Sequence, residues 1–137
     1  MVLAIFLLGV LGTGGELLFL AHTQRFSQLI PIVLMVMSLL VLGWHALERK
    51  SASLRTFQIT MLLLVVAGMV GTGLHYQANE VVEREGDPAI QGMELLSKAM
   101  TGAAPALAPG AMIQLGLLGL VYCFRHPALE QQPKEQL

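Results

Sequence analysis

The sequence has few charged residues, few aromatic residues and only one cysteine. Of its 137 residues, 12% are charged and 6% are aromatic, whereas 55% are hydrophobic. A soluble domain contains about 25% charged residues, so this composition argues against an ordinary soluble domain. Cys123 has no second cysteine with which to form an intrachain disulfide or a CxxC site, and it therefore indicates neither redox compartment nor thiol chemistry.

Positive charge is also scarce and scattered. The sequence has eight basic and nine acidic residues, which gives a formal net charge of -1, and it contains no run of basic residues. Nucleic acids are bound through clustered Lys and Arg, so this class of partner is excluded. The sequence contains no convincing Ser-His-Asp arrangement and no phosphate-binding glycine loop after a strand, so we expect no catalytic residues of the kind found in soluble enzymes.

The few charges separate four long uncharged stretches, which are interrupted only by Glu16. Each stretch exceeds the ~20 residues that a helix needs to cross ~30 Å of hydrocarbon. The sequence therefore predicts an all-α integral membrane protein whose four transmembrane helices form one bundle within residues 1–125. The predicted spans are 2–22, 29–47, 56–78 and 105–124.

The loop between the second and third spans carries Arg49, Lys50 and Arg55. Because Lys and Arg are retained on the cytoplasmic side of a membrane, this loop should be inside. We therefore expect a multi-pass protein of the plasma (inner) membrane with both termini cytoplasmic. Segment 79–110 should lie on the outer surface, and residues 126–137 have the composition of a disordered cytoplasmic tail.

A short amphipathic helix is predicted on the outer surface at about 88–101. Asp87 and Pro88 supply an N-cap and a proline at the first helical position. An apolar stripe with helical spacing should face the protein or the membrane. Two prolines in 102–110 exclude a regular helix there, so that segment is either a shallow connection or dips inward over the bundle. The stripe comprises Ala89, Met93, Leu96 and Met100.

One polar residue in each predicted span lies about 10 Å below the outer surface. These residues are Glu16, Ser38, Thr72 and Gln114. An ionisable side chain inside a membrane is a candidate functional group, so Glu16 could serve a proton-conducting or ion-conducting site. Alternatively, a protonated Glu16 only fixes the helix register by hydrogen bonding to Gln114 or Thr72.

Two histidines, His22 and His75, are expected at similar heights near the outer surface. Facing imidazoles in a bundle can ligate a b-type haem, and nearby carboxylates such as Glu80 or Glu83 could instead complete a metal site. The alternative is that both are helix-end histidines satisfied by neighbouring residues or water. The motifs HExxH and CxxCH are absent.

Small residues share a face with polar ones on several spans, which is typical of closely packed membrane helices. The first and third spans both contain the sequence GTG followed by a histidine, although a match this short does not establish an internal repeat. We carry two hypotheses: an accessory or scaffolding subunit that packs against other membrane protein subunits or copies of itself, and a cofactor or proton site built on Glu16, His22 and His75. The helix-packing glycines are Gly12, Gly15, Gly68, Gly71, Gly116 and Gly119.

Overall fold

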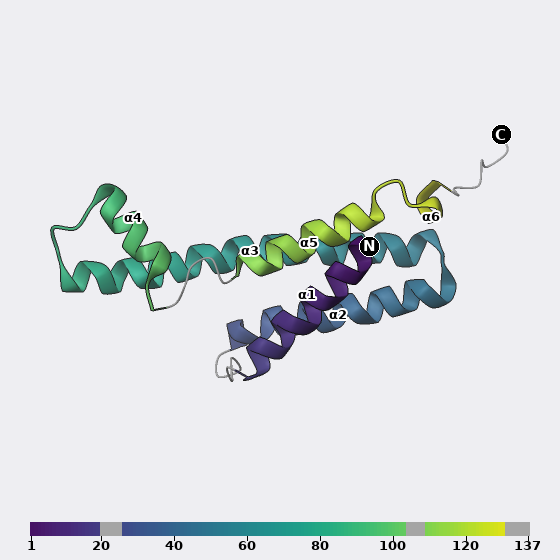
Figure 1. Cartoon of the computed structure of the whole chain (residues 1–137), viewed down its shortest axis with the longest axis horizontal. Helices are drawn as coiled ribbons and strands as arrows, with labels where there is room; N and C mark the ends of the chain where they lie inside the picture. The colour runs from purple at the N-terminus through teal and green to yellow at the C-terminus, as the bar shows by residue number, and fades with distance from the viewer. Residues whose placement is uncertain (20–25, 104–108, 131–137) are drawn as a thin grey trace.

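The structure, a computed structural model, describes residues 1–19, 26–103 and 109–130. These residues form helices and no strand, so the predicted all-α class is confirmed (Figure 1). The helices are α1 (Val2–Phe19), α2 (Phe26–Glu48), α3 (Ser51–Gly86), α4 (Gly92–Thr101), α5 (Gly110–Cys123) and α6 (Pro127–Glu130).

The longest helix, α3, is the common neighbour of α2, α4, α5 and α6. Its 36 residues extend about 54 Å, and Figure 1 shows its far end projecting beyond α1 and α2. The helix is therefore longer at both ends than the predicted membrane span of 56–78. Helix-favouring Glu and Arg residues continue the helix past the apolar segment, and Arg84 Nε donates to Glu80 Oε1 at 2.9 Å across one turn.

Among the residues that the structure describes, three helices are long and apolar enough to cross a membrane: α1, α2 and α3. The predicted count of four is not confirmed, because α5 has only 14 residues and begins at Gly110 rather than near residue 105. Pro109 stands at the N-cap of α5, where a residue without an N–H interrupts no helical hydrogen bond. Residues 20–25 and 104–108, including most of the proline-rich connection, lie outside the described part of the chain.

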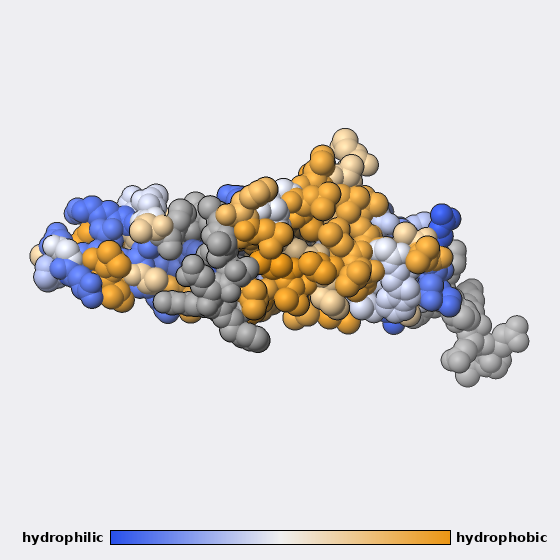
Figure 2. Space-filling view, turned by 90° about the horizontal axis from the view of Figure 1, so that it is seen from below, coloured by the Kyte–Doolittle hydropathy of each residue, from blue (hydrophilic) through white to orange (hydrophobic). Residues whose placement is uncertain are grey.

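The core lies where α1, α2, α3 and α5 meet. Phe6 and Phe57 are completely buried and pack edge to face with ring centroids 5.6 Å apart. Leucines and valines nevertheless cover the middle of the outer surface, which Figure 2 shows as a hydrophobic belt between two more polar ends. An apolar exterior of this extent is typical of a protein surrounded by lipid.

Helix α4 starts later than predicted, and its buried residues are outside the predicted apolar stripe. Asp87 Oδ1 accepts a hydrogen bond from the Ala89 N–H at 3.0 Å, so Asp87 forms a turn rather than a helix cap. The helix starts later, at Gly92, whose φ of 63° suits glycine. Leu95 and Ala99 are buried, whereas Met93 and Leu96 of the predicted stripe are exposed and Met100 is half-buried.

The chain also remains ordered beyond the point at which disorder was predicted. The predicted tail 126–137 begins with α6, in which Ala128 is buried against the core. Proline at the first position of α6 has the φ angle that a helix needs, and burial of an alanine adds apolar contact. Residues 131–137 lie outside the described part of the chain.

Candidate functional site

The four residues of the predicted polar layer do not form a shared network in the structure. Ser38 Oγ donates to the Met35 carbonyl at 2.7 Å, and Thr72 Oγ1 donates to the Gly68 carbonyl at 2.9 Å. These hydroxyls are therefore satisfied within their own helices, as is common for Ser and Thr in apolar helices.

The other two members of the layer, Glu16 and Gln114, have exposed side chains. Among the described residues, no hydrogen bond joins either of them to Ser38 or Thr72. The proton or ion site on Glu16 therefore stays a hypothesis. In this part of the chain, no hydrogen bond links Glu16 to Ser38 or Thr72.

Of the two histidines proposed as haem or metal ligands, the structure describes one. His75 is half-buried on α3, and His22 lies outside the described residues. Within 1–19, 26–103 and 109–130, no three His, Cys, Asp or Glu side chains are grouped as metal ligands would be. The cofactor hypothesis remains a sequence prediction.

Four of the six predicted glycines pack α3 against α5. A Cβ atom on Gly116 would lie 2.7 Å from the backbone oxygen of Met61, and one on Gly68 would lie 2.9 Å from that of Pro109. Gly71 and Gly119 line the same interface. These contacts are too short for any side chain, so glycine is what permits the two backbones to approach so closely.

The remaining two predicted glycines, Gly12 and Gly15, do not lie at a close contact with another described helix. A Cβ atom on either would meet no atom within 4 Å. On α1 it is Gly9 that makes the close approach, with its hypothetical Cβ at 2.5 Å from a methyl of Leu115. The face of α1 that carries Gly12 and Gly15 is thus free of contacts with the described part of this chain.

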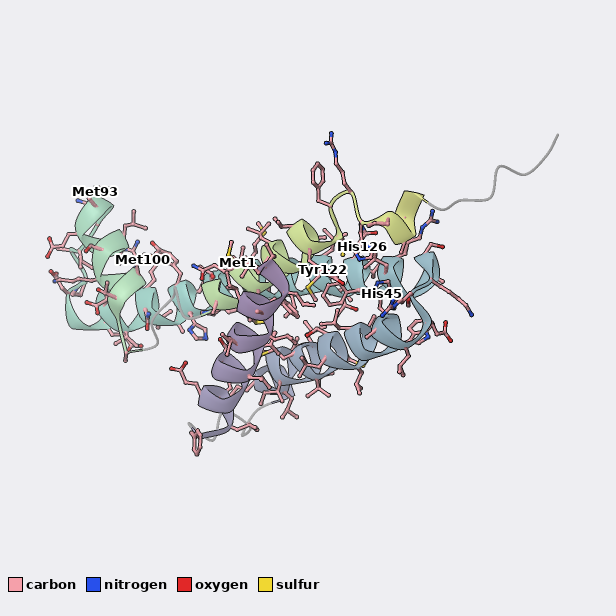
Figure 3. All side chains as sticks on the ribbon, turned by 45° about the vertical axis from the view of Figure 1, so that its right-hand side comes forward. Met1, His45, Met93, Met100, Tyr122 and His126 are labelled. Carbon is pink, nitrogen blue, oxygen red and sulfur yellow. The ribbon has the colours of Figure 1, made fainter. Side chains whose placement is uncertain are left out.

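A cluster that the sequence did not predict lies at the opposite end of the bundle from α4, where α2, α5 and α6 converge (Figure 3). The rings of His45 and His126 meet edge to face with centroids 5.2 Å apart, and Tyr122 stacks at a tilt on His126 at 5.3 Å. Between them is a partly open cavity of about 470 Å³. We call it the end cavity; its lining comprises His45, Ala46, Arg49, Tyr122 and the segment 126–128.

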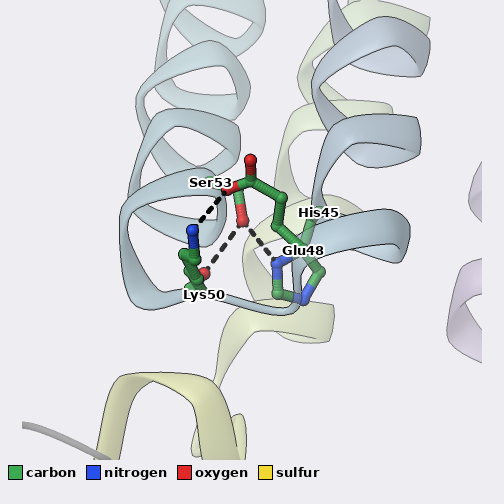
Figure 4. Close-up of polar contacts among 4 residues, drawn as sticks. All are labelled: His45, Glu48, Lys50 and Ser53. Atoms are coloured by element: carbon green, nitrogen blue, oxygen red, sulfur yellow. Dashed lines mark hydrogen bonds and ion pairs between the residues drawn. The ribbon is translucent and has the colours of Figure 1, made fainter.

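The buried end of this cluster is held by the turn between α2 and α3 (Figure 4). Ser53 Oγ donates to the Lys50 carbonyl at 2.9 Å, and the Ser53 hydroxyl oxygen lies 2.9 Å from Nδ1 of His45. Because the serine proton is already used, Nδ1 of His45 must be the donor in the second bond. Lys50 itself forms an ion pair with Glu48 at 3.5 Å.

Two residues that follow the ends of α2 and α5 adopt left-handed backbone conformations. Arg49 has φ 53° and Arg125 has φ 52°, although neither is glycine. The Arg49 N–H donates to the His45 carbonyl at 2.7 Å, which closes the end of α2. A left-handed non-glycine residue is strained, and such strain often accompanies a functional requirement for the side chain.

Sequence reasoning missed this cluster because its two histidines are 81 positions apart and neither belongs to a recognisable motif. His45 was assigned no site role, and His126 was assigned to the predicted tail 126–137. A usable signal was present: the predicted topology puts the end of the second span and the end of the fourth on the same side. Histidines at both ends could therefore have been paired.

No family model matches the chain, and neither curated proteins nor solved structures give a match.

Proposed function

We propose that this protein is a small accessory subunit of the plasma membrane that binds another protein through the segment formed by the end of α3 and by α4. We call this segment the acidic hairpin (80–101). The observation that supports the proposal is the apolar stripe of α4, in which Met93 is 77% exposed and Leu96 is 41% exposed. An outward apolar stripe on a helix beyond the lipid belt is typical of a helix that docks in a groove.

The proposed arrangement has four spans, with α5 as the fourth, and both termini in the cytoplasm. Arg49, Lys50, Arg55 and Arg125 all lie at the end opposite the acidic hairpin. The positive-inside tendency favours the cytoplasm for this basic end and the outside for the acidic hairpin. Helix α3 would then cross the bilayer and extend about 10 Å beyond it through residues 80–86.

The chemistry of the acidic hairpin indicates the kind of partner. Residues 80–98 contain five carboxylates against two cationic side chains, and Val81 and Val82 are also exposed. An apolar patch surrounded by negative charge is complementary to an apolar groove with a basic rim on a partner protein. The alternatives for this surface are a second copy of the chain and the lipid headgroup layer.

The hairpin is held rigidly enough to present this stripe. Buried Asn79 on α3 donates from Nδ2 to the Ala99 carbonyl on α4 at 2.8 Å. The side chain of Asn79 also contacts Gly102, where a Cβ atom would come within 2.7 Å. With Leu95 and Ala99 buried against α3, the opposite side of α4 is the one that a partner would meet.

Site-specific photo-crosslinking in cells tests the proposal. A photoreactive amino acid at Met93 should give a discrete protein adduct, whereas the same residue at exposed Lys98 on the polar side of α4 should not. The second change Leu96→Glu should abolish the Met93 adduct because it puts a charge on the stripe. Crosslinks to lipid alone, or equal adducts from Met93 and Lys98, would contradict the proposal.

Self-association through α1 is the other interaction to examine, because a Cβ atom on Gly12 or Gly15 would meet no atom of the described chain within 4 Å. Replacement of Gly12 and Gly15 by Leu should change the size of the native complex only if a second chain packs there. Gly116 and Gly119 are unsuitable for this test, since they already pack against α3 within the chain. An unchanged complex would exclude α1 as the oligomer interface.

A further inference from the structure

The hydrogen bonds around the end cavity determine which ring nitrogens carry protons. Nδ1 of His126 accepts from the Ala128 N–H at 3.3 Å, so the proton of the neutral ring lies on Nε2. His126 therefore acts as a donor at Nε2, and His45 donates from Nδ1 to Ser53.

The charged residue that lines the end cavity is Arg49, and no acidic residue is among the lining residues. A guanidinium offers several N–H donors in a planar fork, and it matches the oxygens of a phosphate group. The cavity therefore combines a permanent positive charge with neutral donors from His126 and Tyr122. This donor set is suited to an anion.

The same hydrogen bonds disfavour a metal ion between the two histidines. A metal on Nε2 of His126 would have to displace the last ring proton, because the lone pair on Nδ1 is already accepting from the backbone. Metal-bound histidine ordinarily donates from its second nitrogen to an acceptor. His126 shows the reverse pattern.

The backbone at Arg49 supplies an independent argument. Its left-handed φ of 53° is one that glycine adopts without strain, and glycine is the commonest residue directly after a helix. The chain nevertheless has an arginine at this position, with its side chain against the cavity. A requirement for that side chain would explain why the strain is retained.

We propose that the end cavity binds a phosphate group, carried either by the headgroup of a membrane lipid or by a soluble phosphate ester. Arg49 would bind the phosphate oxygens, and Nε2–H of His126 would donate to one of them. The cavity volume of about 470 Å³ falls in the range of about 300–1,000 Å³ that is typical of small-ligand sites. Its position at the polar boundary of the hydrophobic belt is the level at which lipid phosphates lie (Figure 2).

Arg125 offers a matched control. Like Arg49 it follows a helix at the basic end with a left-handed backbone, but it does not line the cavity, and its guanidinium lies over the Phe124 ring at 5.3 Å. Arg49→Gly and Arg125→Gly each remove one positive charge and one strained residue. Both should raise the thermal midpoint slightly, so loss of binding in one of them cannot be assigned to unfolding.

Native mass spectrometry of the full chain in mild detergent would measure binding. The probes are phosphatidic acid, phosphatidylglycerol, diacylglycerol without a phosphate, and glycerol 3-phosphate without acyl chains. We expect the phosphate-bearing lipids to bind more tightly than diacylglycerol. Arg49→Gly should weaken the binding of these lipids about 10-fold or more, as expected for loss of a charge-assisted hydrogen bond. Arg125→Gly should weaken it less than about 2-fold.

His126→Asn tests the second donor. Asparagine can still accept from the Ala128 N–H and start α6, but it lacks a group in the place of Nε2–H. We expect about 10-fold weaker binding with an unchanged thermal midpoint. Binding of glycerol 3-phosphate as well as lipid would identify soluble esters as ligands, and binding of lipids alone would identify the headgroup. Equal losses in Arg49→Gly and Arg125→Gly, or equal affinity for diacylglycerol, would overturn the proposal.

Discussion

The interface between α3 and α5 makes a quantitative prediction at Gly116. A Cβ atom there would lie 2.7 Å from the Met61 backbone oxygen and 2.6 Å from a methyl of Val65. Backbone atoms in the middle of a helix cannot move singly, so Gly116→Ala must push the two helices apart. Such overpacking costs about 1–3 kcal/mol.

Alanine also gains helix propensity over glycine, worth up to about 1 kcal/mol, and this gain must be separated from the steric cost. Gly12→Ala supplies the separation, because it makes the same chemical change in a helix where the new methyl group meets no atom within 4 Å. The propensity gain then cancels between the two variants. Their difference in free energy of unfolding should be the overpacking cost of about 1–3 kcal/mol.

The measurement is reversible unfolding of the detergent-purified protein by titration with a denaturing detergent. Loss of helix is monitored by circular dichroism. The free energy of unfolding of Gly119→Ala should lie between those of Gly116→Ala and Gly12→Ala. Its new methyl group would meet the flexible thioether of Met61 rather than a backbone atom, and that side chain can adopt another rotamer. If Gly116→Ala is as stable as Gly12→Ala, then α3 and α5 do not approach as closely as the structure shows.

Three further predictions concern the hairpin, the topology and the Glu16 carboxyl. Asn79→Leu should destabilise the acidic hairpin by about 1–2 kcal/mol because the Ala99 carbonyl loses a buried donor, and hydrogen exchange of α4 amides should become about tenfold faster or more; unchanged exchange would show that the bond contributes nothing. Cysteines at Ser51 and Asp87 should react with an impermeant reagent from opposite sides of the membrane, and labelling of the Ser51 position in intact cells would reverse the topology. Glu16→Gln and Glu16→Leu should both fold, because no described residue hydrogen-bonds the exposed carboxyl; if both fold but only Glu16→Gln retains complex formation, a polar group without a titratable proton is sufficient.

The apolar stretches predicted the helices well but not the lengths of all of them. Uncharged residues mark the part of α3 that suits lipid, whereas its actual ends are set by backbone hydrogen bonds and by residues such as Glu80 and Arg84 that favour helix in water. Composition cannot distinguish the limit of a membrane from the limit of a helix. The 36-residue length of α3 was for this reason underestimated.

The sequence did not determine which face of α4 packs against α3. Residues 89–100 contain two apolar sets with helical spacing, one with Met93 and Leu96 and the other with Leu95 and Ala99. Periodicity alone gives no preference between them. The hydrogen bond from Asn79, 20 positions away, contributes to selecting the second set, and no local pattern could have revealed it.

The candidate site at the end cavity depended even more on long-range contacts. Its residues come from α2, α5 and α6, and only the return of α5 along α3 brings His126 to His45. The glycines Gly68, Gly71, Gly116 and Gly119, which the sequence did indicate, are what permit that return. The sequence therefore predicted the packing residues but not the cluster that the packing creates.

The contacts of α1 have a consequence for how the chain is made. This helix packs mainly against α5 and only sparingly against α2, its neighbour in the sequence. During synthesis α1 is therefore inserted some hundred residues before its main neighbour exists, and Phe6 and Val10, which end up buried, must first face lipid or the insertion machinery. A nascent chain halted before Gly110 should leave α1 without its main packing partner, so completion of the bundle is one of the last events in the biogenesis of this protein.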